Sequence, residues 1–216
     1  MEKKKKMKGG STDTEFYIQL AIIAILAVLL VYNAGKIYSG KAVGVGIASA
    51  SEVIPRGVPE IYGKEIGVSY DDVSPSNPRL ADATIRKLRQ YEGMELNSEQ
   101  MKRYIKIGTS ISCEYCCGAK AIIFENGQRA CGCAHSFAMR GLAKYLIANH
   151  PDMSDEQILS ELGKWKVLFF PGIHEQKAKI LESKGIDSKN YVNLASNKYR
   201  GIEKGQASAG AMVGGC

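Results

Sequence analysis

The sequence predicts a mainly α-helical protein in which a transmembrane helix near the N-terminus precedes a small α+β metal-binding domain with one short β-hairpin. Three observations support this fold class. An uninterrupted apolar run lies near the N-terminus, helix-capping residues precede several amphipathic stretches, and residues 111–137 hold five of the six cysteines. The last feature also indicates where the chemistry of the protein should lie.

Length and charge limit the classes of function. The 216 residues suffice for one domain with an appendage. The formal net charge is +7, but residues 1–8 carry five lysines and one glutamate, which leaves 24 basic and 21 acidic residues, or +3, for the rest. A nucleic-acid-binding protein would spread Lys and Arg over a folded face with aromatic residues between them. No such block follows residue 8, so we expect no nucleic-acid partner.

The N-terminal region has the pattern of a membrane anchor. Residues 1–15 contain the lysine cluster, and residues 16–32 are apolar except for Gln19. A span of about 17 residues is at the lower limit for crossing a bilayer. Small residues suitable for signal-peptide cleavage do not follow at the required spacing. The sequence therefore predicts an uncleaved single-pass anchor in the cell membrane, with the bilayer as partner, the N-terminus in the cytoplasm and the remaining chain outside it.

The same segment resembles the signal of type IV prepilins. Gly10 is followed five residues later by Glu15, as at a prepilin cleavage site. The resemblance implies self-assembly into a filament as an alternative function. Residues 11–14 are polar where pilins are apolar, which is a departure from the pattern.

Beyond the anchor, residues 33–52 are rich in Gly, Ala and Ser, which predicts a flexible linker. An extracytoplasmic globular domain should occupy residues 53–197. Its helices should begin after Asn77, Asn97 and Ser154, because each is a capping residue in a suitable local pattern. Residues 198–216 are small and polar, which predicts a flexible tail ending in Cys216.

The cysteine-rich segment has the spacing of a ligand site. It begins with a Cys-x-x-Cys pair, continues through a short apolar run and an Asn-Gly turn, and ends in Cys-Gly-Cys before a helix-like stretch. Thiolates and imidazoles at such spacings bind zinc. The candidate ligands are Cys113, Cys116, Cys117, Cys131, Cys133 and His135.

The order of knuckle, hairpin and helix over residues 111–151 resembles a treble-clef zinc finger. That resemblance implies two ligands from the knuckle and two from the turn that enters the helix. Zinc is the predicted ion. Cys117 is surplus to a four-ligand zinc site, so an iron-sulfur cluster, copper, structural disulfides and redox-active thiols remain alternatives.

The motifs CEYCCG and CGCAHSFAMRGLAKYL also resemble uncharacterised membrane-anchored, cysteine-rich archaeal proteins and, more weakly, exported bacterial proteins with a PCYCGC motif. Neither resemblance implies an activity. A catalytic thiol would need a base held by a third group, and the sequence shows no such constellation. We therefore expect a metal-binding protein with a structural or metal-handling role, and possible protein partners, in preference to an enzyme.

Overall fold

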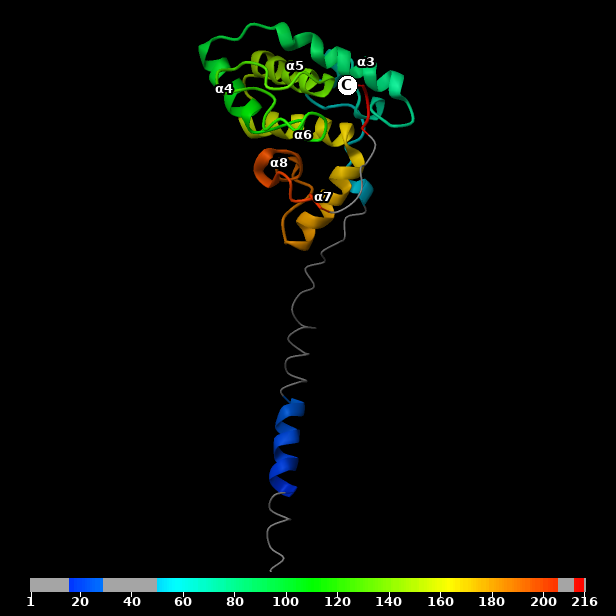
Figure 1. Ribbon diagram of the computed structural model, residues 1–216, viewed down its shortest axis with the longest axis vertical. Coiled ribbons are helices and arrows are strands. Elements are labelled where there is room, and N and C mark those ends of the chain that lie inside the picture. The colour runs from blue at the N-terminus through cyan, green and yellow to red at the C-terminus, as the bar shows by residue number, and fades with distance from the viewer. Residues whose placement is uncertain (1–15, 29–49, 206–211, 216) are drawn as a thin grey trace, which may run out of the picture. The chain divides into compact units, whose positions relative to one another are not determined.

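The computed structural model describes residues 16–28, 50–205 and 212–215 (Figure 1). The chain divides into two compact units, residues 1–46 and residues 47–216. In the first unit, the described part is a helix over residues 16–28, with all of its side chains exposed.

The predicted membrane span is wrong for the described part of the chain. None of the helices described there is long and apolar enough to cross a membrane. Residues 29–32 of the expected span lie outside the described residues. The single-pass localisation rested on that span and is corrected with it.

The second unit is built from helices and turns. Its longer helices are α3 (Pro78–Arg89), α4 (Ser98–Thr109), α5 (Ala134–Asn149), α6 (Asp155–Phe169) and α7 (Pro171–Ser183). Shorter elements are α2 (Gly63–Ile66), α8 (Tyr191–Ala195) and the 3₁₀ turns Ala50–Val53, Tyr70–Asp72, Gln90–Gly93 and Asn197–Tyr199.

Helix α5 lies at the centre of this unit, between α3 and α6 (Figure 1), and also packs against α4. Most of its residues are buried, including Leu142 and Leu146, which are fully inaccessible. Gly141 allows α3 to approach closely, because a Cβ atom at this position would overlap the backbone carbonyl oxygen of Leu88. The apolar stripes of several helices therefore meet on α5 and form one core.

The predicted helix starts are confirmed. Asn77 accepts a hydrogen bond from the amide of Leu80, and Pro78 occupies the first helical position. Asn97 and Ser154 each form a capping box with the glutamine three residues later. Local side-chain chemistry thus sets these boundaries before any tertiary contact is made.

The predicted β-hairpin is wrong, and with it the α+β, treble-clef-like fold. The described residues contain no strand, and the expected hairpin is reduced to a tight turn with one isolated antiparallel bridge between Ile123 and Arg129. Phe124 and Ala130 donate across the turn to the carbonyls of Gln128 and Ile122, but the Ile122 amide donates to the carbonyls of Gly108 and Ile111, so no regular ladder forms. The apolar side chains that suggested a strand are buried against the helices.

Candidate metal centre

Sulfur atoms from both ends of the cysteine-rich segment converge at the N-terminus of α5. The Sγ atoms of Cys113, Cys116 and Cys133 lie within 4.8 Å of one another, and those of Cys117, Cys131 and Cys133 form a second such group. Cys133 belongs to both groups and its sulfur lies 3.3 Å from that of Cys113 and 3.5 Å from that of Cys131. These cysteine groups could hold a metal ion.

The structure records an oxidised form of the cluster. Cys117 and Cys131 form a disulfide, and Cys116 is also disulfide-bonded, whereas Cys113 and Cys133 are free thiols. Cys117 is exposed and Cys113 is fully buried, so the cluster extends from the surface into the core. Metal binding would use its reduced form, because thiolates are the ligands.

Cys133 caps helix α5. Its Sγ accepts a hydrogen bond of 3.4 Å from the amide of Ser136, which is one of the unpaired amides at the helix N-terminus. The hydrogen bond with Cys113 and these contacts lower the pKa of Cys133, while the same pairing and burial raise the pKa of Cys113. The pairing therefore favours a thiolate at Cys133 over one at Cys113, and the helix dipole favours negative charge at the same position.

A buried arginine fixes the second half of the cluster. Arg140, in the second turn of α5, donates to the carbonyl oxygens of Cys131 at 2.8 Å and Ile122 at 3.0 Å. Its Nε also pairs with Glu92 at 2.6 Å, and both side chains of this pair are at least 90% buried. The Cys131 backbone is thus attached to the same helix that presents Cys133.

A buried ion-pair network adjoins the other half. Glu114, inside the Cys-x-x-Cys loop, pairs with Arg200 at 3.0 Å and lies 3.7 Å from the ammonium group of Lys166. Burial lowers the pKa of Lys166 to about 8, and Glu114 opposes this effect. The charge of Lys166 also lowers the pKa of Cys113. The hydrogen bond with Cys133 and burial raise that pKa by more. A cation at this place favours negative charge on the cluster.

The network continues into α7. Lys177 is fully buried and lies 4.0 Å from Glu203. The Lys177 ammonium, the Tyr115 hydroxyl, Nε2 of His174 and both oxygens of Glu203 find no hydrogen-bond partner among the described residues. Such a concentration of unpaired polar atoms is costly in a protein interior.

His174 makes folding pH-dependent. Its Nδ1 donates to the Phe170 carbonyl at 2.9 Å, and burial and the charge of Lys166 hold its pKa well below the usual value. Because the unfolded chain takes up a proton below about pH 6.5 and the folded chain does not, stability should fall as the pH drops from that value. We expect the His174→Gln substitution to reduce the slope of the unfolding free energy against pH, below about pH 6.5, by about 1.4 kcal/mol per pH unit. Urea unfolding at several pH values between 7.5 and 5 would measure this, and an unchanged slope would contradict it.

The predicted ligand His135 is placed differently from the cysteines. It is fully buried, its Nε2 lies 2.8 Å from the Val213 carbonyl oxygen, and its ring packs against Phe169 and Phe170. It belongs to neither group of converging ligand atoms. It contributes instead to lowering the pKa of Cys133.

Several residues that shape the centre were not found from the sequence. Arg140, Lys166 and Lys177 appear in the sequence as ordinary charged residues of amphipathic helices. The one available signal was Glu114, a carboxylate between two predicted ligands. Its burial depends on cations supplied from α6 and from residues near the end of the chain.

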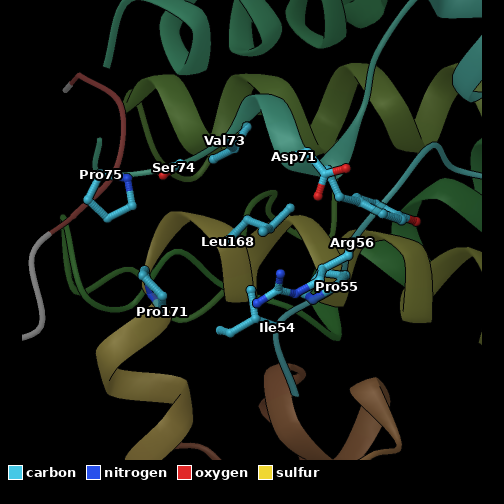
Figure 2. Close-up of a pocket in the computed structure, with 10 residues that line it drawn as sticks. Ile54, Pro55, Arg56, Asp71, Val73, Ser74, Pro75, Leu168 and Pro171 are labelled. Atoms are coloured by element: carbon cyan, nitrogen blue, oxygen red, sulfur yellow. The ribbon is translucent and has the colours of Figure 1, made fainter. Parts of the chain in front are cut away.

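The structure also has a shallow pocket of about 240 Å³ at a different place (Figure 2). Three prolines and the apolar side chains of Ile54, Val73 and Leu168 line it. Arg56 and Asp71 supply charge, but Asp71 already accepts the Gly57 amide at 3.0 Å. The lining contains neither cysteine nor histidine, so the cysteine cluster remains the candidate functional site.

No protein-family model, curated protein or solved structure matches this chain. The site must therefore be interpreted from its own chemistry.

Proposed function

We propose that the reduced cysteine cluster binds one zinc ion and that the protein has a structural or metal-handling role. Cys113, Cys116 and Cys133 would supply three thiolates and Cys131 the fourth. The observation that carries this proposal is the convergence of the Cys113, Cys116 and Cys133 sulfurs, from two separate segments, within 4.8 Å of one another. The Cys131 sulfur lies outside this group but 3.5 Å from that of Cys133.

The spacing of the sulfurs suits a single ion. With zinc–sulfur bonds of about 2.3 Å, the sulfurs of a tetrahedral site are about 3.8 Å apart. The separations of 3.3 Å and 3.5 Å around Cys133 are close to this value. A [4Fe–4S] cluster would need its cysteines farther apart, because each of them binds a different iron. Small adjustments of side-chain torsions would therefore suffice for zinc.

The surroundings also favour such a complex. Four thiolates around a divalent ion carry a net charge of about −2. The N-terminus of α5 and the ammonium group of Lys166 offset part of this charge in a region from which water is largely excluded.

Thiol–disulfide exchange is a second candidate function. The Cys133 sulfur lies 3.5 Å from Cys131, which is bonded to the exposed Cys117. Attack by the Cys133 thiolate on Cys131 would form a Cys131–Cys133 disulfide and release Cys117 as a thiolate. The low pKa of Cys133 favours the attack, but a disulfide across Cys-Gly-Cys is a strained product.

Metal titration separates the two functions. The protein, reduced and freed of metal under anaerobic conditions, should bind one zinc ion per chain in competition with a chromogenic chelator. The bound ion should protect at least four thiols from alkylation. Failure of the reduced, folded protein to compete for zinc would overturn the proposal. Catalysed reduction of a model disulfide by the metal-free protein would then favour exchange.

A further inference from the structure

Three arginine side chains gather around the Phe137 ring of α5. The guanidinium carbon atoms of Arg89, Arg140 and Arg129 lie 4.3, 4.5 and 5.0 Å from the ring centroid. Arg89 ends α3, Arg140 belongs to α5, and Arg129 lies in the segment before α5. An aromatic ring has two faces, so at least two of these guanidiniums share one of them. The fold thus concentrates positive charge from three separate segments at one place.

Glu92 supplies the carboxylate that pairs with two of these arginines. Nε of Arg140 donates to it at 2.6 Å, and Nε and Nη2 of Arg129 both donate to it at 2.9 Å. Arg89 takes no part in these ion pairs. Nη2 of the fully buried Arg140 finds no hydrogen-bond partner within the part of the chain that the structure describes. A buried donor without an acceptor is costly, so this cluster has more donors than its own acceptors satisfy.

A hollow of about 490 Å³ opens beside the cluster. Arg129, Lys144 and Glu92 line it together with the apolar groups of Met101 and Tyr104. The Lys144 ammonium lies 5.5 Å from the centroid of the Tyr104 ring. Burial lowers the pKa of Lys144, and the charges of two neighbouring arginines lower it further against the opposing effect of Glu92. The hollow therefore combines an apolar wall with positive charge that the Glu92 carboxylate does not fully offset.

We propose that this hollow binds the phosphate group of a small organic molecule. Four cations, Arg89, Arg129, Arg140 and Lys144, stand against one carboxylate here, which leaves a formal excess of three positive charges. A phosphomonoester carries about two negative charges at pH 7 and matches this excess better than a monocarboxylate does. Guanidiniums bind phosphate oxygens through paired hydrogen bonds, and the apolar wall would contact the organic part. The site uses neither the cysteines nor a metal ion, so it is independent of the proposed zinc binding.

Calorimetric titration of the full chain in a phosphate-free buffer tests the proposal. Phenyl phosphate should bind saturably at one site per chain, and inorganic phosphate about tenfold more weakly, because it leaves the apolar wall uncovered. Benzoate has a similar ring but one negative charge, so it should bind at least about tenfold more weakly than phenyl phosphate. Absence of saturable binding by phenyl phosphate, or equal binding of benzoate, would overturn the proposal. Equal affinities for the two phosphate compounds would overturn the organic ligand and leave a site for free phosphate.

Two substitutions test the residues. Lys144→Gln and Arg129→Gln should each weaken phenyl phosphate binding at least about tenfold, because each removes a cation that lines the hollow. Lys179→Gln removes one charge from an exposed position on α7 and is the matched control, with an affinity within about twofold of the unchanged chain. Circular dichroism should show that all three variants keep their helices. Equal affinities in Lys144→Gln and Lys179→Gln would show that binding reflects only the net charge of the chain and would overturn the site.

Discussion

Cys113→Ser is expected to abolish zinc binding by the reduced protein. Cys113 is fully buried and its sulfur lies 3.3 Å from that of Cys133, so a hydroxyl at this position would face the centre without a thiolate's charge. Removal of one of four thiolate ligands should cost roughly 4 kcal/mol, or about a thousandfold in affinity. Competition with a chromogenic chelator would measure the loss, and circular dichroism of the metal-free variant would show that the helices persist.

Cys117→Ser is the matched control, because Cys117 is exposed and lies outside the proposed ligand set. It should retain zinc with an affinity within about threefold of the unchanged chain. Loss of zinc binding in Cys117→Ser but not in Cys113→Ser would place the ion in the group of Cys117, Cys131 and Cys133 and contradict the proposed ligands.

Arg140→Met should lower the free energy of unfolding by about 3–5 kcal/mol, because it leaves the Glu92 carboxylate without its buried partner. It also removes the hydrogen bonds to the carbonyls of Cys131 and Ile122, so the Cys131 end of the centre should loosen. Urea denaturation would give the loss of stability, and zinc affinity should fall in the same variant.

Arg129→Met provides a close comparison. Arg129 pairs with the same carboxylate at 2.9 Å, and its guanidinium also lies over the Phe137 ring, but its side chain is 63% exposed. Its loss should cost no more than about 1 kcal/mol. Similar effects of the two substitutions would show that burial of Arg140 does not decide the strength of the pair.

The starts of three helices could be predicted from sequence because capping is a local interaction. Asn77, Asn97 and Ser154 each bond to an amide two or three residues away, and no distant residue is needed. The error over the hairpin has the opposite cause. Ile122 and Ile123 have strand-like composition, but their backbone and side chains are engaged by α4 and the core, so tertiary packing overrides local preference.

The sequence by itself determined which residues can do chemistry, through the spacing of five cysteines around a turn and a helix start. It also determined the principal helix boundaries, because those signals act within one turn of chain. Only the tertiary structure decided how the cysteines are surrounded. Burial of Glu114 with Lys166 and Arg200, attachment of Cys131 by Arg140, and docking of Val213 on His135 join residues 9 to 86 positions apart. Such contacts depend on the packing of helices around α5, and no local pattern of residues encodes them.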